Sequence, residues 1–364
     1  MPPTDPSLAR RYRRLLRCYP RDWRQARTPE VVGLLLDTAP PGRTRPTARE
    51  TVDLVRAGLR CRLGRPRSRT VVAWAVLASV ICGLFTGALA SRAAWETSRP
   101  QPDRAEAGAI LAEVFPGHDL GDLDVPPALF VVYGQPLTLG NVRSVLLGDG
   151  GEYQESATGA GALGAPPVPA EQIVAVARQR LTASGWQVYD PEVSGGITCA
   201  DKVCATPLAI TQTDLRARRG DTVLTASISS QTNADATYLA VELHRAPPPL
   251  AAPTGALGTL LGAMVAFLVF GWASRRTEGR RGDGAAKFFF GVALVLWWLP
   301  VPLAAPQLLR HHLDEPHPAW HPLWEWLGQP VASLLFLVGA VCALLALGLA
   351  AEPRRKRSPV ALVE

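Results

Sequence analysis

The sequence predicts an α-helical integral membrane protein with four spans, a small all-α head before the first span, and an α+β two-layer domain after it. Composition is the first observation: 48% of the 364 residues are hydrophobic and 19% are charged, whereas about 25% are charged in an average soluble protein. The second is that four uncharged stretches each exceed the roughly 18 residues that a membrane-spanning helix requires. These stretches are residues 70–91, 246–274, 288–309 and 327–351.

The distribution of Lys and Arg predicts the orientation, because basic segments are retained on the cytoplasmic side of a membrane. Of 38 basic residues, 26 lie in residues 1–69, 275–287 and 352–364, whereas residues 92–253 carry 11 basic and 18 acidic residues. We therefore expect a multi-pass protein of the cell membrane with both termini in the cytoplasm. The predicted order is a cytoplasmic head (1–69), span 1 (70–91), an extracytoplasmic domain (92–253), span 2 (254–274), a cytoplasmic loop (275–287), span 3 (288–309), an external loop rich in His and Trp (310–328), span 4 (329–351) and a basic cytoplasmic tail (352–364).

A cleaved signal peptide is the alternative interpretation of the first apolar stretch. Ala88-Leu89-Ala90 at its end resembles a small-residue cleavage site. However, 69 residues precede this stretch, far more than the basic segment of a signal peptide contains. Uncleaved insertion is therefore favoured.

The first 69 residues show helical periodicity, which predicts a folded head. The first helix carries Leu8, Tyr12, Leu15, Leu16 and Tyr19 on one face and ends at Pro20. A second helix is expected to begin at Thr28, with Pro29 in its first turn.

A third helix is predicted after Thr47, which forms a capping box with Glu50. Its inward face is expected to consist of Val52, Val55, Leu59 and Leu63, and Gly64 is expected to end it. Three short amphipathic helices can cover one another's apolar faces. We expect the resulting head to bind a cytoplasmic protein partner, and we assign Tyr12, Leu15, Leu16 and Leu59 to this partner-binding module.

The head also resembles a known group of proteins over about residues 10–63. The resemblance is carried by three segments: Arg11-Tyr12-Arg13-Arg14-Leu15-Leu16-Arg17-Cys18-Tyr19-Pro20-Arg21, Leu34-Leu35-Leu36-Asp37 and Arg49-Glu50-Thr51-Val52-Asp53-Leu54-Val55. These segments are similar to the cytoplasmic heads of actinobacterial multi-pass membrane proteins. Such heads occur on permease-like and signalling proteins associated with PadR-type transcriptional regulators. The resemblance implies a bacterial membrane protein whose head takes part in regulation or transport.

The segment between the first two spans is long enough for a domain with its own core. A helix capped by Asp103 should carry Ala107, Ile110, Leu111 and Val114, and a second helix from Ile173 should end at Gly185. Helices separated from antiparallel strands indicate an α+β two-layer domain. Strands are expected at 129–133, 142–147, 186–189, 208–210, 222–229 and 237–244.

Cys199 and Cys204 are the only two of six cysteines predicted to face the oxidising side of the membrane. Four residues separate them, so a turn at Asp201-Lys202 can bring them within disulfide distance. A metal site would require two further ligands that the neighbouring sequence does not provide. We therefore predict a disulfide between them.

Two clusters contain the residue types that bind metal ions. His311, His312, His317 and His321 lie in the external loop with Asp314 and Glu315, which could together bind a divalent cation. The tryptophans and prolines of that loop instead favour an amphipathic connector in the headgroup region. His118, Asp119, Asp122 and Asp124 lack the closing glutamate of a calcium loop, so a solvated acidic loop is favoured.

Two other motifs have simpler interpretations. Residues 159–164 match the glycine pattern of a dinucleotide-binding loop, but Pro166-Pro167 follow instead of a helix, so residues 158–169 are predicted to be a flexible linker. Arg219-Gly220-Asp221 is expected to be a hairpin turn, not an adhesion motif.

The four apolar stretches contain no Asp, Glu, Lys, Arg or His, the residues on which proton and ion pathways usually depend. They do contain two pairs of glycines at the spacing that allows close helix packing, within the chain or in a homo-oligomer. These pairs are Gly83 with Gly87 and Gly258 with Gly262. The arginines of the head are explained by topology and by attraction to lipid, so nucleic acid is not expected as a partner.

These observations favour a non-enzymatic membrane protein of signalling or regulatory type, with an external sensing or binding domain. The first alternative is an accessory or permease-like subunit of a transporter, because similar heads occur on permease-like proteins. The second is an extracytoplasmic enzyme, although the sequence has no G-x-S-x-G or H-E-x-x-H motif. No cofactor is expected.

Overall fold

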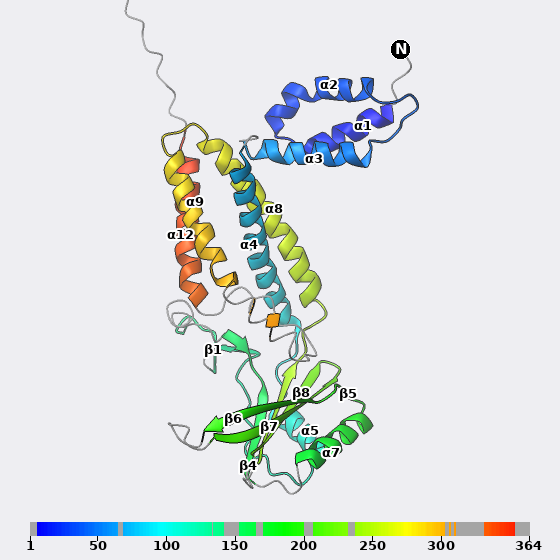
Figure 1. The fold of residues 1–364 in the computed structure, drawn as a ribbon, viewed down its shortest axis with the longest axis vertical. Coiled ribbons are helices and arrows are strands. Elements are labelled where there is room, and N and C mark those ends of the chain that lie inside the picture. The colour runs from blue at the N-terminus through cyan, green and yellow to red at the C-terminus, as the bar shows by residue number, and fades with distance from the viewer. Residues whose placement is uncertain are drawn as a thin grey trace, which may run out of the picture. The chain divides into compact units, whose positions relative to one another are not determined.

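The computed structural model describes two compact units of the chain (Figure 1). One unit comprises Met1–Thr86, Thr259–Trp298 and Phe336–Glu364, and the other comprises Gly87–Gly258 and Leu299–Leu335. The described residues are 6–64, 68–132, 134–141, 153–164, 170–199, 207–231, 237–302, 306, 309–310 and 331–353.

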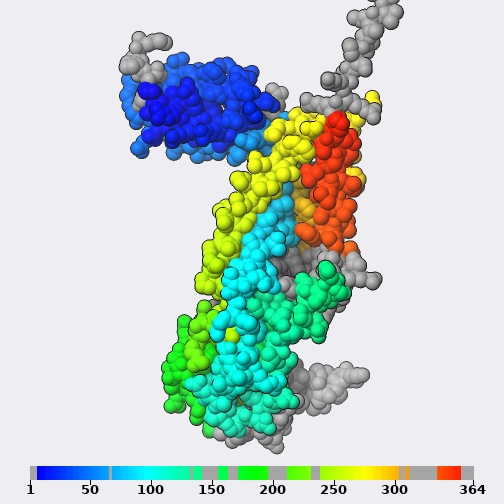
Figure 2. Space-filling view, turned by 180° about the vertical axis from the view of Figure 1, so that it is seen from behind, coloured from blue at the N-terminus to red at the C-terminus, as the bar shows by residue number. Residues whose placement is uncertain are grey.

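The head, residues 6–64, is helical and forms a compact mass (blue in Figure 2). Its elements are α1 (Pro6–Leu15), the 3-10 turn η1 (Leu16–Cys18), α2 (Arg21–Asp37) and α3 (Ala48–Arg62). The capping box of α3 is present: Thr47 accepts a hydrogen bond from the backbone of Glu50, and Glu50 accepts one from the backbone of Thr47. Gly64 follows α3 with a φ of 76°, the left-handed conformation that ends helices.

The second helix begins at Arg21, not at Thr28 as predicted. Pro20 is its N-cap, and Tyr19 stacks on Trp23 at 4.0 Å, which fixes the chain as it enters the helix. Pro29 lies inside α2, where it removes one backbone donor. Packing of Val32 in the core of the head maintains the helix across this position.

The inward face of α3 also differs from the prediction. Leu54 and Cys61 pack on the core of the head, whereas Val52 and Leu59 are exposed. The physical reason is Gly58, because a Cβ there would lie 2.9 Å from Cys18 Cβ and from the ring of Tyr19. The absent side chain lets α3 approach η1 along the Leu54–Gly58 face, and the other apolar face is left outside.

Four helices among the described residues are long and apolar enough to cross a membrane, as predicted. They are α4 (Arg69–Ala94), α8 (Ala251–Thr277), α9 (Asp283–Trp298) and α12 (Val331–Ala351). The candidate span that contains α9 continues to Pro302. Helices α4, α8 and α9 extend beyond the uncharged stretches at one end or both. Charged side chains therefore enter their ends, among them Asp283 and Lys287 in α9, which the sequence analysis placed in a loop.

The second unit contains an antiparallel sheet domain with two helices, α5 (Arg104–Val114) and α7 (Ala170–Ala183). The main sheet has the order β4-β9-β8-β7-β5, with β6 also paired to β7. Its strands are β4 (Thr158–Gly164), β5 (Gln187–Val188), β6 (Glu192–Cys199), β7 (Pro207–Arg219), β8 (Thr222–Gln231) and β9 (Thr237–Arg245). A smaller sheet, β2-β1-β3, is formed by β1 (Phe130–Val132), β2 (Gln135–Pro136) and β3 (Tyr153–Glu155).

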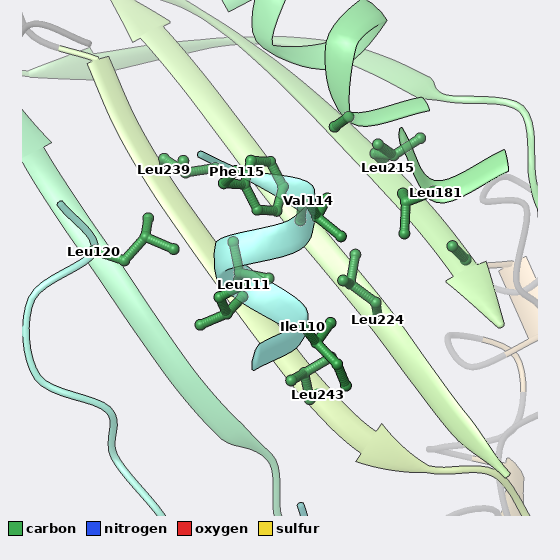
Figure 3. Packing of buried hydrophobic residues seen from close by; sticks show 14 of the residues in the cluster. Ile110, Leu111, Val114, Phe115, Leu120, Leu181, Leu215, Leu224, Leu239 and Leu243 are labelled. Atoms are coloured by element: carbon green, nitrogen blue, oxygen red, sulfur yellow. The ribbon is translucent and has the colours of Figure 1, made fainter. Parts of the chain in front are cut away.

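Helices α5 and α7 supply one side of the core of this domain, and alternate residues of the sheet supply the other (Figure 3). Ile110 and Val114 of α5 lie close to Leu224 and Leu243, and Leu181 of α7 belongs to the same cluster. Asp103 caps α5 through a 2.8 Å hydrogen bond to Glu106 N, and Gly185 ends the α7 segment with a φ of 79°. The predicted combination of helices and antiparallel strands is therefore present.

The predicted linker at 158–169 is wrong in its first half, because residues 158–164 form β4. All seven residues pair with β9, from Thr158 with Leu243 to Gly164 with Thr237. The side chains of β4 are small and bury little apolar surface. Backbone pairing with β9 therefore holds this edge strand in the sheet. Gly220, with a φ of 63°, turns the chain between β7 and β8 as the hairpin interpretation requires. The predicted strand at 142–147 lies outside the described residues.

Candidate functional site

Three of the predicted packing glycines, Gly83, Gly87 and Gly262, lie where α4 and α8 approach each other. A Cβ on Gly83 would lie 2.9 Å from Thr259 O, and a Cβ on Gly262 would overlap the side chain of Thr86. The second unit contains the remaining residues of these two helices. There, a Cβ on Gly255 would lie 3.5 Å from Gly87 O. Close backbone approach therefore depends on small residues at this contact.

Within the head, Tyr12 and Leu16 are completely buried, and Leu15 is partly buried against the same core. Tyr12 donates a 2.9 Å hydrogen bond to Glu50, which also pairs with Arg43 at 2.6 Å. Burial and the bond to Glu50 raise the pKa of Tyr12. Burial alone would raise the pKa of Glu50, but its hydrogen bonds from Arg43, Thr47 and Tyr12 outweigh burial and lower it. These residues hold the head together, whereas Leu59 is on its surface.

The remaining predicted sites lie partly or wholly outside the described residues. Cys199 ends β6, but Cys204 is outside, so the disulfide stays a prediction. His311, His312, His317 and His321 are also outside. Within the described part of the chain, no group of three or more His, Cys, Asp or Glu side chains is arranged to hold a metal ion.

The α+β domain contains a buried ionic cluster that sequence analysis did not identify. Arg245 is 2% exposed and forms two hydrogen bonds to Glu106, of 3.1 and 2.9 Å. It also donates to Pro100 O and to Thr222. Asp221 lies 3.7 Å from Arg245 and pairs with Arg99 at 2.7 Å. Because these partners satisfy Arg245, the cluster is best explained as a clamp that joins α5 to the start of β8 and the end of β9.

His244 of β9 has a pKa far below the ordinary value of an imidazole. Burial lowers its pKa from 6.5 to about 4. In the unfolded chain the imidazole would bind a proton near pH 6.5, so the folded domain should lose stability as the pH falls from 6.5 towards 4. From these two values we expect a loss of about 2 kcal/mol between pH 7.5 and pH 5.

This expectation is tested by urea unfolding of the full-length protein in detergent, read from protease cleavage of the α+β domain. The variant His244→Gln has no titrating group at this position and should lose most of the pH dependence. An equal pH dependence in this variant would mean that other groups cause it.

The clearest cavity in the first unit lies among the ends of the four span helices. Its volume is about 330 Å³. This is just above the lower limit for small-molecule sites, about 300 Å³. Its apolar wall includes Trp74, Phe270 and Phe290, whose rings contact one another: the centroids of Phe270 and Phe290 are 4.9 Å apart. The other apolar lining residues are Val71, Ala273, Ala286, Ala346 and Leu347.

Polar groups enter this cavity from helix ends. Asp283 and Lys287, one turn apart on α9, form an ion pair of 2.7 Å. Thr277 near the end of α8 donates to Ala273 O, and Ser274 donates to Leu63 O at 2.8 Å. Ser68 and Thr70, at the start of α4, also line the cavity. All these positions belong to the end of the bundle from which the head extends.

The cavity combines an aromatic wall with one acidic and one basic side chain, which suits a small amphipathic molecule. The described lining residues include no His or Cys. The residues come from four helices far apart in the sequence, so no local motif reveals the site. The helical spacing of Asp283 and Lys287 was the only sequence signal, and it was assigned to a loop. Comparison with family models, with curated proteins and with solved structures finds no match to this chain.

Proposed function

We propose that this protein is a non-enzymatic signalling or regulatory protein of the bacterial cell membrane. In this proposal the α+β domain binds or senses a condition outside the cytoplasm, and the head binds a cytoplasmic protein. The head precedes α4, and the α+β domain lies between α4 and α8. If each span helix crosses the bilayer once, these two folded parts are on opposite sides, and the basic head is on the cytoplasmic side.

The continuity of α8 is the observation that carries this proposal. This helix begins at Ala251, and only five residues separate it from the end of β9 at Arg245. Near its other end, Ser274 donates to Leu63 O, directly after α3 of the head. Leu63 also packs with Phe270 of α8 and Ala75 of α4. One helix therefore follows directly from the sensing domain and is bonded to the head, which is the connection that a transmembrane signal requires.

The side of the membrane on which each segment lies is tested by fusing a reporter to the chain at two positions. A reporter fused after Pro248, behind β9, should be active only outside the cytoplasm. A reporter fused after Gly282, between α8 and α9, should be active only inside. The same sidedness for both fusions would contradict the four-span arrangement.

The role of the head is tested with two substitutions of leucine by aspartate. Leu16 is completely buried in the head, so Leu16→Asp should unfold this small module. Leu34 is 64% exposed on α2, so Leu34→Asp is a matched control that keeps the fold. We expect both variants to insert into the membrane, and only Leu16→Asp to lose the cytoplasmic proteins that copurify in mild detergent. If the same proteins copurify with both variants, or none with the unchanged protein, the head is not the partner site.

A second candidate function is an accessory subunit of a transporter. The cavity with Asp283 and Lys287 favours it, because a polar site at the end of a helix bundle is a place where a small molecule can enter. Copurification of a transport ATPase with the intact chain would favour this function over signalling.

A further inference from the structure

Helix α3 has two apolar faces, and only one of them is used within the head. Leu54, Gly58 and Cys61 face the core of the head. The second face consists of Val52, Val55, Leu59 and Leu63, spaced at i, i+3, i+7 and i+11, which places them in one line along the helix. Val52 is 62% exposed and Leu59 is 40% exposed. This line of residues is named the outer stripe.

The contacts of Leu63 indicate what covers the outer stripe. Leu63 is buried against Ala75 of α4 and Phe270 of α8, which are span helices. The face of α3 that carries the stripe is therefore the face turned towards the spans. Figure 1 shows α3 extending sideways from the end of α4, with α2 farther from the span helices. From Leu63 back towards the start of α3, the same face continues past the edge of the bundle, where lipid surrounds the spans of an inserted protein.

The charges beside the stripe point to the same surroundings. By helical spacing, Arg49, Arg56 and Arg60 follow one edge of the stripe, and Asp53 lies beyond them on the side away from it. Within the described part of the chain, none of these three arginines forms an ion pair with an acidic side chain. An apolar stripe bordered by arginines is typical of a helix that lies in a membrane surface. Each such arginine adds to the attraction of the helix to anionic lipid.

We infer that α3 lies along the bilayer surface, with Val52, Val55 and Leu59 among the lipid headgroups and with Arg49, Arg56 and Arg60 beside anionic phosphates. This inference rests on the membrane insertion in the proposed function, but not on its sidedness or on signalling. It gives α3 the role of a fixed support that holds the head against the membrane.

Photocrosslinking in the full-length chain tests this inference. Benzoylphenylalanine replaces Leu59, Val52, Leu34 or Leu260 in separate proteins, which are reconstituted in vesicles of phosphatidylcholine and phosphatidylglycerol and irradiated. Leu34 is the exposed control on α2, and Leu260, 70% exposed on span helix α8, reports insertion itself. We expect phospholipid adducts at 59, 52 and 260, with a yield at 59 severalfold higher than at 34.

The outcomes separate this inference from the proposed function. Phospholipid adducts at 260 without adducts at 59 and 52, a protein adduct at 59, or equal lipid yields at 59 and 34 would each overturn the position of α3 while leaving the spans intact. An absence of lipid adducts at 260 as well would overturn membrane insertion, and with it the proposed function.

The arginines are tested in the same assay by comparing vesicles with and without phosphatidylglycerol. Arg49→Gln, Arg56→Gln and Arg60→Gln together should remove the severalfold increase that the anionic lipid produces at position 59. The matched control is Arg10→Gln, Arg13→Gln and Arg14→Gln, which removes the same charge from the exposed side of α1 and should retain the increase. Equal effects of the two triple variants would show that the net charge of the head, not α3, attracts the lipid.

Discussion

Replacing Glu106 with alanine should destabilise the α+β domain by about 3 kcal/mol, because it leaves the buried guanidinium of Arg245 without its main counter-charge. Arg245 is almost completely buried, and Glu106 supplies two of its hydrogen bonds. Asp221, 3.7 Å away, remains but is engaged by Arg99. Removing one partner of a buried pair costs more than a surface ion pair contributes, since a charge then remains in an environment of low polarity.

The effect is measured by amide hydrogen exchange of β8 and β9 in the full-length protein in detergent. A loss of 3 kcal/mol corresponds to exchange that is faster by a factor on the order of 100. Glu96→Ala is the matched control: Glu96 is 74% exposed in its pair with Arg92, so its removal should cost at most about 0.5 kcal/mol.

A double variant distinguishes the unpaired charge from loss of packing. Glu106→Ala combined with Arg245→Met removes both charges and keeps an apolar side chain of similar length. It should be more stable than Glu106→Ala alone, because no buried charge remains unpaired. If the double variant is less stable than the single variant, the energetic argument for the cluster is wrong.

Replacing Gly262 with alanine should destabilise the bundle of span helices by about 2 kcal/mol, as expected when a methyl group is forced into a filled contact. The new Cβ would lie 2.7 Å from Thr86 Cβ, so rotation of the Thr86 side chain cannot relieve the overlap. Helices α4 and α8 must separate, and they would lose contacts along the whole line from Gly83 to Thr259.

The midpoint of thermal unfolding in detergent tests this expectation, and a fall of about 5 °C is expected for a protein of this size. Gly348→Ala in α12 is the matched control, since a Cβ at Gly348 meets no atom within 4 Å. That change should be neutral or slightly stabilising because alanine favours the helix. Gly83→Ala combined with Gly262→Ala should cost less than the two single changes together, because the first already separates the helices. Equal midpoints for Gly262→Ala and Gly348→Ala would show that this contact does not hold the bundle.

Local features of the fold were predictable because their causes lie within a few residues of one another. The capping box at Thr47, the helix ends at Gly64 and Gly185, and the hairpin turn at Gly220 each depend on one turn of chain. The four span helices were equally predictable, since length and hydrophobicity suffice to identify them. The strand β4 was missed because its Gly and Ala residues carry little strand preference, and its pairing with β9 involves residues about 80 positions away.

The sequence alone determined that the chain contains a basic helical head, four helices apolar enough to span a membrane, and an α+β domain. The tertiary structure decided how these segments face one another. It placed Arg245 against Glu106, joined Asp283 and Lys287 to an aromatic cavity, and directed one of the two apolar faces of α3 to the core of the head. The physical reason is that periodicity reports that a face is apolar, whereas close packing decides what covers it. For α3 that decision depends on Gly58, where the absence of one Cβ lets the helix approach Tyr19.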